Sequence, residues 1–387
     1  MVNIFCMNAI SPKGLDLLTD EYQIVDSIEE ADAVLVRSAN MRDMEIPERV
    51  KAIARAGAGV NNIPLGKCAQ RGIVVFNTPG ANANAVKEAV ITGMLLACRD
   101  MIGGTNWVAE EKDNPEISTV MEQKKKAFAG SELLGKKLGV IGLGAVGAAV
   151  ANTGKALGMS VMGYDPFISI LGAWHLDNHV EYVESLDVLY READFISIHV
   201  PLLDDTKHMI NDEALAKMKD GVVILNFARD LLVDDDALAK ALESGKVHRY
   251  VTDFPNPTTA KLPNVIAFPH LGASTTEAED NCAKMAVRQI REYMEKGNII
   301  NSVNFPLLTL DRTESVARAV IFHKNVHSML ATITTVFADH NVNIANIVDK
   351  SRGDNACLLI DLDSPVTPEI EKDLRAVPGV FGVRIVK

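Results

Sequence analysis

Short apolar runs alternate with amphipathic segments along most of the chain. The short runs suit buried strands and the longer segments have helical spacing, a rhythm typical of an α/β fold with a parallel sheet. In the N-terminal part, this pattern predicts strands at 2–8, 33–37 and 73–76, and helices around 14–20 and near 48–55.

The same rhythm continues from Leu138 onward and predicts a second parallel-sheet domain. Each predicted strand is followed by a polar turn or by a turn with Gly or Pro. The strands are expected at 138–141, 160–164, 195–200, 222–226, 249–253 and 265–268. Because open α/β sheets bind ligands beyond the carboxyl ends of their strands, we expect functional residues at these ends.

The pattern changes after residue 306. A polar stretch at 311–315 suits a linker. The elements beyond it follow the order βαββαβ, which is the ferredoxin-like plan, and we expect its single face to prefer a partner surface. They are strands at 319–322, 343–350, 357–362 and 380–386 and helices at 329–340 and 368–377. We therefore expect three domains: 1–95 with 280–306, then 96–279, then 316–387.

Composition narrows the class of protein. The chain has 387 residues, of which 48% are hydrophobic and 23% charged, with a net charge of −12. The acidic balance argues against nucleic acid or anionic lipid as partners, although an anionic substrate would need a local cationic pocket. Apolar runs are too short or too charged to span a membrane.

Five cysteines are widely spaced in mostly apolar surroundings. They are Cys6, Cys68, Cys98, Cys282 and Cys357. This spacing predicts reduced thiols, with neither disulfides nor a metal site. The N-terminus has no basic region or cleavage site, so we expect no export signal and a cytoplasmic location.

A glycine-rich turn stands between an apolar strand and a helix-like segment at 148–157. It reads Gly142-x-Gly144-x-x-Gly147, with Ala145 and Val146 inside it. The first glycine allows the tight turn, the second admits a pyrophosphate and the third lets helix pack on strand. Asp165, at the end of the next strand, is placed to bind the adenosine ribose and to repel a 2′-phosphate. NAD is therefore expected rather than NADP.

Two later strand ends carry residues that suit the oxidation of a secondary alcohol. Hydride transfer needs a base for the hydroxyl proton and a cation for the neighbouring carboxylate. In Pro269-His270-Leu-Gly-Ala-Ser274, His270 can be the base, since imidazole titrates near neutrality. In Asn226-Phe-Ala-Arg229, Arg229 offers a planar fork for a carboxylate. The alternatives are a core or capping histidine and a surface arginine.

The order and spacing of these motifs, together with His199-Val-Pro-Leu-Leu-Asp-Asp-Thr206, resemble the D-isomer-specific 2-hydroxyacid dehydrogenases. The resemblance covers residues 1 to about 306. It implies that Arg229 and His270 are catalytic. It also implies further NAD-binding positions, which are His199, Pro201, Thr206, Asn226, Ala228, Asp253, Gly272 and Ala273.

One departure from the family concerns the base. Members usually place a Glu in a D-x-F-x-x-E-P segment beside the histidine, whereas this chain reads Asp253-Phe-Pro-Asn-Pro257 and has no Glu between Asp253 and His270. The histidine is then tuned by Asp253, by Lys261 or by solvent alone. Asp230 also stands where the family usually has Gly.

The resemblance extends to the members that oxidise D-3-phosphoglycerate. It implies substrate contacts at Arg37, Ser38, Gly57, Asn82 and Lys125. Gly57 lies in a backbone-amide turn that suits a carboxylate. For the lysines at 124–126, a solvated charge run on a helix is the alternative.

The C-terminal segment resembles the ACT domains found in that branch of the family. His323, Asn325 and Asn343 match amino-acid-binding positions, while His327 and Ser328 replace the usual Pro-Gly. A glycine there lets the backbone reach the ligand, so we expect weak or absent inhibition by L-serine. A purely structural or oligomerising domain is the alternative. For the whole protein we expect a homodimer or homotetramer.

The resemblance thus implies NAD-dependent oxidation of D-3-phosphoglycerate to 3-phosphohydroxypyruvate, the first step of serine synthesis by the phosphorylated route. One alternative is another D-2-hydroxyacid dehydrogenase, acting on glycerate or lactate. A second is an NAD-sensing, corepressor-like binding protein, which need not keep Arg229 and His270 together.

Overall fold

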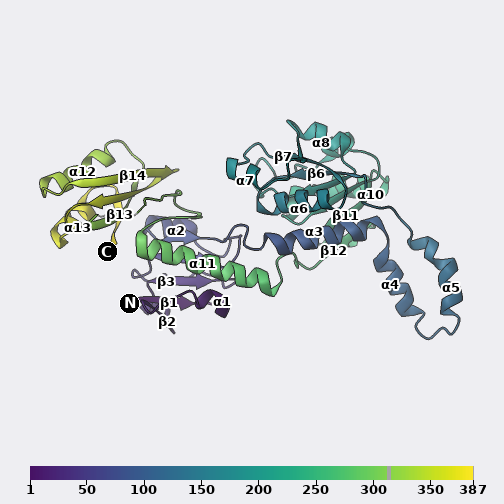
Figure 1. Ribbon diagram of the computed structural model, residues 1–387, viewed down its shortest axis with the longest axis horizontal. Helices are drawn as coiled ribbons and strands as arrows, with labels where there is room; N and C mark the ends of the chain where they lie inside the picture. Colours follow the sequence, from purple (N-terminus) through teal and green to yellow (C-terminus); the bar gives the residue numbers. More distant parts are fainter. Residues whose placement is uncertain (312–314, 387) are drawn as a thin grey trace. The chain divides into compact units, whose positions relative to one another are not determined.

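The computed structural model describes residues 1–311 and 315–386, so most of the expected linker at 311–315 lies outside the described residues. The chain divides into two compact units, Met1–Asn82 with Thr276–Lys387, and Ala83–Thr275 (Figure 1). We call them unit 1 and unit 2. The domain limits expected from the sequence stay predictions, and the ACT-like segment belongs to unit 1.

The N-terminal sheet of unit 1 is parallel, with strand order β2-β1-β3-β4-β5. Its strands are β1 (Val2–Cys6), β2 (Tyr22–Val25), β3 (Ala33–Val36), β4 (Ala52–Arg55) and β5 (Val74–Phe76). Its helices are α1 (Pro12–Leu15), α2 (Leu65–Gln70) and the long α11 (Thr276–Lys296). Buried Ala283, Ala286 and Val287 of α11 pack against Leu35 and Phe76 of the sheet.

The helix expected near 48–55 is wrong. Residues 52–55 form β4, which pairs with β3 on one side and β5 on the other. Ala52, Ile53 and Ala54 are all fully buried, because a central parallel strand is covered on both faces and shows no alternation. The two alanines, which favour helices in isolation, concealed this strand in the sequence.

Unit 2 holds a seven-stranded parallel sheet of order β12-β11-β10-β9-β6-β7-β8. Its strands are β6 (Lys137–Ile141), β7 (Ser160–Tyr164), β8 (Glu181–Tyr182), β9 (Phe195–Ile198), β10 (Val222–Asn226), β11 (Val247–Thr252) and β12 (Val265–Ala267). α3 (Ala83–Cys98) and α6 (Ala145–Ala156) cover one face. α8 (Leu186–Glu192), α9 (Asp212–Lys217) and α10 (Asp235–Glu243) cover the other, which completes the doubly wound α/β fold.

Two more helices of unit 2, α4 (Met101–Glu110) and α5 (Ile117–Lys124), extend from the end of α3 as a pair (Figure 1). Neither contains a buried residue. Trp107 of α4 contacts Phe128, which ends the short 3-10 helix Lys125–Phe128 after α5; their ring centroids are 6.3 Å apart. The short α7 (Ile170–Trp174) follows β7.

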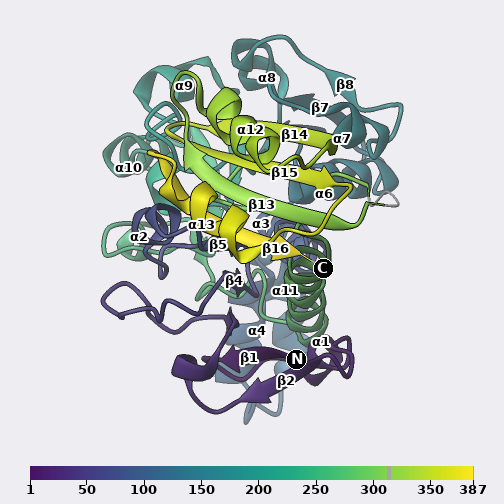
Figure 2. The ribbon, with the colours of Figure 1, turned by 90° about the vertical axis from the view of Figure 1, so that its left-hand side faces the viewer.

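The C-terminal part of unit 1 is a four-stranded antiparallel sheet of order β14-β15-β13-β16. In chain order its elements are β13 (Ala317–Lys324), α12 (Met329–Asp339), β14 (Ile344–Arg352), β15 (Asn355–Leu362), α13 (Pro368–Ala376) and β16 (Val380–Val386), which confirms the predicted ferredoxin-like plan. Both helices cover one face (Figure 2).

The other face of this sheet packs on the α/β part of unit 1. Val320, Phe322 and Leu359 share a core with Phe76 and Tyr293, and the Phe322 ring lies 4.7 Å from that of Phe305. We expected the free face of this sheet to pack against a partner surface. The α/β part of the same chain provides that surface.

Two arginines fix this packing. Arg318 forms a buried ion pair with Asp361, at 2.6 Å and 2.8 Å, and donates to the carbonyls of Lys296, Leu310 and Asp311. Arg384 donates to the carbonyls of Tyr293 and Met294 near the end of α11. Helix ends leave carbonyls without backbone partners, and these guanidinium groups satisfy several of them.

Across the described ranges, no helix is both long and apolar enough to cross a membrane. The five thiols are free, and all but that of Cys6 are buried. The residues with described positions contain no His, Cys, Asp or Glu cluster arranged to hold a metal ion.

Candidate functional site

The glycine-rich turn of unit 2 has the backbone that a dinucleotide site requires. Gly142 has φ of +88°, and a Cβ there would lie 2.8 Å from the carbonyl oxygen of His199. A Cβ on Gly147 would lie 1.9 Å from the Gly142 oxygen, so helix α6 can pack only on glycine. A Cβ on Gly144 would meet no atom within 4 Å. The turn is therefore closed on the protein side and open where a pyrophosphate would approach, at the first residues of α6, Ala145 and Val146.

Asp165 stands at the end of β7, as predicted, and is tied to this turn. One carboxylate oxygen accepts the Leu143 N–H at 2.8 Å and the other accepts the Phe167 N–H at 2.9 Å. Each oxygen keeps a further lone pair for a ribose hydroxyl. The negative charge beside the turn is the feature expected to exclude a 2′-phosphate.

The segment from His199 to Thr206 forms a loop beyond β9. The Thr206 hydroxyl donates to the Pro201 carbonyl at 2.7 Å and accepts the Leu203 N–H at 2.8 Å, which closes the loop. His199 Nε2 lies 2.8 Å from the Ser197 hydroxyl. Burial lowers the pKa of His199 to about 4, so this ring is neutral at pH 7.

Arg229 is held at the end of β10 by Asn226, which is fully buried. The Asn226 amide donates to the Arg229 carbonyl at 2.8 Å, and its oxygen accepts the N–H groups of Ala228 and Arg229. A second donor bond, to the Tyr250 hydroxyl at 3.0 Å, anchors the amide to β11. The turn therefore presents Arg229 at the surface while its backbone stays fixed.

Asp253 follows β11 and is almost fully buried. Its Oδ2 accepts the Gly272 N–H at 3.0 Å, and a Cβ on Gly272 would lie 2.7 Å from that oxygen. Its Oδ1 has no protein partner among the described residues. Burial raises the pKa of Asp253, although the Gly272 bond and nearby His270 and Arg229 act in the opposite direction. An orphan acceptor of this kind suits an amide donor such as a carboxamide.

His270 and Arg229 both lie against the ring of Phe254. The His270 and Phe254 ring centroids are 4.4 Å apart, and the Arg229 guanidinium carbon lies 5.4 Å from the Phe254 centroid. His270 has φ of +52°, an uncommon backbone for a residue with a Cβ. Unit 2 thus brings the two predicted catalytic residues together, beside Asp253 and Gly272, and the neighbouring Ala273 packs against the core of unit 2.

The candidates for tuning the histidine differ in position. The Asp253 and His270 charges act on each other, whereas Lys261 is exposed at the end of a short helix, Thr259–Lys261, and no contact joins it to His270 within the described chain. Asn256, between these two candidates in the sequence, accepts the backbone N–H groups of Thr258 and Thr259 with its side-chain oxygen, each at 2.9 Å.

Unit 1 places other predicted residues at the carboxyl ends of β3 and β4. The Asn8 side-chain oxygen accepts the N–H groups of Arg37 and Ser38, each at 3.1 Å, and so shapes the turn. Gly57 follows β4, and its carbonyl accepts the Thr78 N–H at 3.1 Å. Arg37, Ser38 and Gly57 are therefore brought together, and Asn82 lies at the end of the loop after β5.

Two charged residues at this edge were missed from the sequence. Arg55 donates to the Arg37 carbonyl at 2.9 Å and to the Gly59 carbonyl, which places its guanidinium beside the Arg37 turn. Glu279, in the first turns of α11, pairs with Arg37 at 2.5 Å. The edge thus carries two arginines and one carboxylate.

Lys125 belongs to unit 2 and lies just after α5. It is exposed and pairs with Glu122. The structure therefore shows it as part of a charged helix surface, and its proposed contact with phosphate stays a prediction.

The three ACT-like candidates are not gathered within one chain. His323 is buried, with Nε2 3.2 Å from Asp349 and Nδ1 2.9 Å from the Lys324 carbonyl. Burial alone would lower the pKa of His323, but these two bonds outweigh it and raise the pKa above its usual value. Asn325 donates to the Gly353 carbonyl after β14, and Asn343 precedes β14, so the strand's length separates them.

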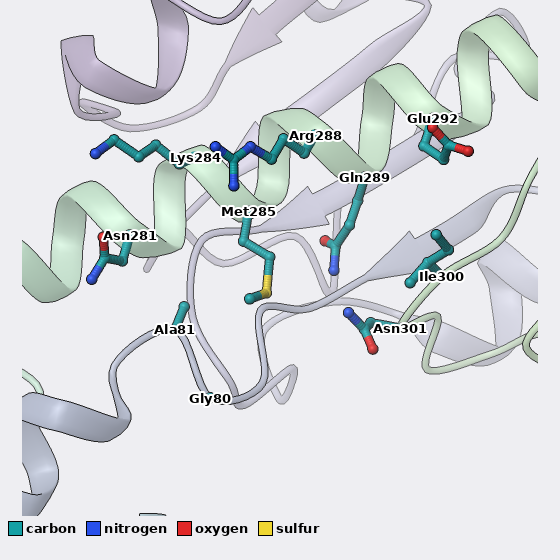
Figure 3. Close-up of a pocket in the computed structure, with 10 residues that line it drawn as sticks. All are labelled: Gly80, Ala81, Asn281, Lys284, Met285, Arg288, Gln289, Glu292, Ile300 and Asn301. Carbon is teal, nitrogen blue, oxygen red and sulfur yellow. The ribbon is translucent and has the colours of Figure 1, made fainter. Parts of the chain in front are cut away.

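A cavity of about 570 Å³ lies beside α11 in unit 1 (Figure 3). Met285 and Gln289 of α11 point toward the Gly80–Ala81 loop, and Lys284 and Arg288 lie along the helix above them. Gln289 donates to the Asn77 carbonyl at 2.9 Å and thereby braces the loop that ends at Asn82. None of the predicted substrate residues lines this cavity.

Comparisons with known proteins agree with this geometry. The NAD-binding domain of the D-isomer specific 2-hydroxyacid dehydrogenases matches residues 91–272. Hydroxypyruvate reductase of Thermotoga maritima is 43% identical over 270 residues, covering 66% of this chain and 83% of that protein. D-3-phosphoglycerate dehydrogenase of Haemophilus influenzae is 30% identical over 380 residues, covering 95% of this chain and 89% of that protein.

Longer relatives and a solved structure are similar as well. D-3-phosphoglycerate dehydrogenase of Methanocaldococcus jannaschii is 36% identical over 341 residues; the match covers 86% of this chain but only 62% of that protein. The NAD⁺-bound crystal structure of 3-phosphoglycerate dehydrogenase from Entamoeba histolytica is 29% identical, with a TM-score of 0.61, and covers 79% of this chain and 99% of that one. The chain therefore belongs to the D-isomer specific 2-hydroxyacid dehydrogenases, and its cofactor is NAD.

Proposed function

We propose that this enzyme oxidises D-3-phosphoglycerate to 3-phosphohydroxypyruvate with NAD, the first step of serine synthesis by the phosphorylated route. The observation that carries the proposal is the pair of arginines, Arg37 and Arg55, at one edge of unit 1. A phosphorylated hydroxy acid has a second anionic group besides its carboxylate, and arginine binds such groups with two parallel hydrogen bonds. The names of the relatives from Haemophilus influenzae and Methanocaldococcus jannaschii support it.

The residues of unit 2 have separate roles in this proposal. Arg229 binds the substrate carboxylate and polarises the neighbouring carbonyl, and His270 accepts the hydroxyl proton as the hydride leaves carbon. NAD supplies the hydride acceptor when it is bound at the Gly142–Gly147 turn. Asp253 orients it by accepting from the carboxamide, since its Oδ1 is buried and has no protein partner among the residues described.

The test is NADH formation with D-3-phosphoglycerate, D-glycerate and D-lactate. We expect kcat/KM to be highest for the phosphorylated acid. Replacing Arg37, Arg55 or Lys125 by Gln should raise KM for D-3-phosphoglycerate more than for D-glycerate, because only the former has a phosphate. Equal effects on both acids would refute a phosphate role, separately for each residue.

A second candidate is the reduction of unphosphorylated hydroxypyruvate. Two observations favour it: the Thermotoga maritima relative carries that name, and Glu279 already neutralises Arg37. NADH oxidation with hydroxypyruvate and glyoxylate, compared with 3-phosphohydroxypyruvate, distinguishes the two candidates. A cytoplasmic homodimer or homotetramer remains our proposal for its location and assembly.

A further inference from the structure

Arg229 and His270 come from different strand ends, yet the same aromatic ring touches both. The Phe254 ring centroid lies 4.4 Å from the His270 ring centroid, with an angle of 44° between the planes, and 5.4 Å from the Arg229 guanidinium carbon. Arg229 follows β10, Phe254 follows β11 and His270 follows β12. These three strands are neighbours in the sheet of unit 2. The two side chains therefore share one aromatic contact.

Phe254 is itself held firmly. Its N–H donates to the buried Thr252 hydroxyl at 3.0 Å, and Asp253 beside it is tied to Gly272. Pro255 follows directly and restricts the backbone on that side. Phe254 is partly buried, whereas His270 and Arg229 are exposed.

The His270 imidazole has no carboxylate hydrogen-bond partner among the described residues. Within the described part of the chain, no ion pair or hydrogen bond of the His270 imidazole is present, and the sequence from Asp253 to His270 contains no Glu. The Oδ2 atom of Asp253 accepts the N–H of Gly272 instead. The Phe254 ring is thus the group that packs on the imidazole, while the Arg229 guanidinium lies against the same ring and the Asp253 carboxylate is close enough to act on His270 through its charge.

We propose that Phe254 is a positioning residue, which holds the His270 imidazole and the Arg229 guanidinium in register for the reaction and stabilises the imidazolium that forms. This inference rests on the roles proposed above for those two residues. During oxidation the O–H proton passes to His270 while the hydride passes from carbon to NAD, leaving a ketone and a cationic imidazole. The face of an aromatic ring is negative and attracts such a cation.

The first test compares Phe254→Leu with Phe254→Tyr, using whichever 2-hydroxy acid the wild type oxidises. For Phe254→Leu we expect kcat to fall roughly tenfold, since both side chains lose their common support, while KM for NAD stays near the wild-type value. The acid limb of the kcat/KM profile should move to lower pH by about 0.4–0.7 units. That shift is an exposed cation–π contact of about 0.5–1 kcal/mol converted at 1.36 kcal/mol per unit. Phe254→Tyr keeps the ring and should restore both properties.

Asp253→Asn and Lys261→Ala are the matched comparisons. If the ring is the dominant partner, neither variant shifts the acid limb as far as Phe254→Leu does. An unchanged profile in Phe254→Leu, or a larger shift in Asp253→Asn, overturns the proposal.

The second test needs no turnover. NMR titration of the His270 imidazole, with NADH binding as the check on folding, should give a lower midpoint in Phe254→Leu than in wild type or Phe254→Tyr. If none of the acids is oxidised, the proposed function fails, and this titration still decides the role of Phe254. Equal midpoints in all three proteins would overturn it.

Discussion

The buried pair of Arg318 and Asp361 allows a sharp prediction about how the ACT-like part is attached. The guanidinium has five N–H groups, and the structure uses all five, two on Asp361 and three on the carbonyls of Lys296, Leu310 and Asp311. Arg318→Leu leaves Asp361, which is fully buried, without its countercharge. Breaking a buried pair on one side costs about 3–5 kcal/mol.

The assay is urea unfolding of the full chain, followed by circular dichroism, because both tryptophans, Trp107 and Trp174, lie in unit 2. We expect the first transition of Arg318→Leu to move to a clearly lower urea concentration. The matched control is Arg49→Leu, because Arg49 also binds an aspartate, Asp32, through two nitrogens but is half exposed. An exposed pair contributes much less, so this variant should shift the transition less.

A double variant separates charge from shape. Arg318→Leu combined with Asp361→Leu should recover a large part of the loss, since the buried carboxylate that lost its countercharge is then removed as well. If Arg318→Leu unfolds at the same urea concentration as wild type, or shifts no further than Arg49→Leu, the pair does not stabilise the packing of this sheet on unit 1.

Three further predictions concern the site in unit 2. Asp165→Ser should raise kcat/KM with NADP relative to NAD, because the carboxylate that repels a 2′-phosphate is gone; equal use of both cofactors by the wild type would contradict this role. Arg229→Lys should lower kcat/KM by about 100-fold or more, since the bidentate carboxylate contact is lost; near-normal activity would show that Arg229 does not bind the carboxylate. The pKa of His199 is about 4 when folded, below about 6.5 when unfolded. The unfolded chain therefore takes up a proton first, and stability falls as pH drops from about 6.5 to 4, by about 2–3 kcal/mol in all. In urea titrations, the free energy of unfolding of His199→Asn should fall less than that of the wild type between about pH 6.5 and 4.

The sequence was sufficient for most elements of the fold because their patterns are strong. Strands β7 and β10 have the predicted limits, since each is an apolar run closed by a polar residue. Helix α6 begins at Ala145, three residues before its expected start, because the glycine turn leads directly into it. The failure at β4 has a different origin. A central strand made of Ala, Ile and Ala has too little β-branched character to be distinguished from a helix.

That error also concealed a site residue. Read as the end of a helix, Arg55 did not appear at a strand end, where functional residues were expected. Glu279 gave no local signal at all, because it is 242 residues from its partner Arg37. The role of Phe254 depends likewise on contacts between three strand ends. Sequence spacing identified the residues that the family shares, whereas the partners of those residues follow from the tertiary structure.

In the ACT-like segment, Ser328 occupies a backbone conformation that suits glycine. Ser328 has φ of +65° and ψ of 3°, the left-handed region in which a Cβ is unfavourable. Ser328→Gly should therefore stabilise the protein, by about 1 kcal/mol. Urea unfolding measures this, and a loss of stability would show that the Ser328 side chain makes a contact that outweighs the strain.

Binding of L-serine is a separate question, and the sheet geometry restricts the answer. Asn325 and Asn343 lie at opposite ends of β14, roughly 27 Å apart at about 3.3 Å per residue. One small ligand cannot reach both within a chain, so any site that uses both needs two copies. We expect calorimetry to find weak or no binding of L-serine by the wild type, because Ser328 narrows the approach to the backbone. Binding gained only in Ser328→Gly would support this account, whereas tight, saturable binding by the wild type would refute it.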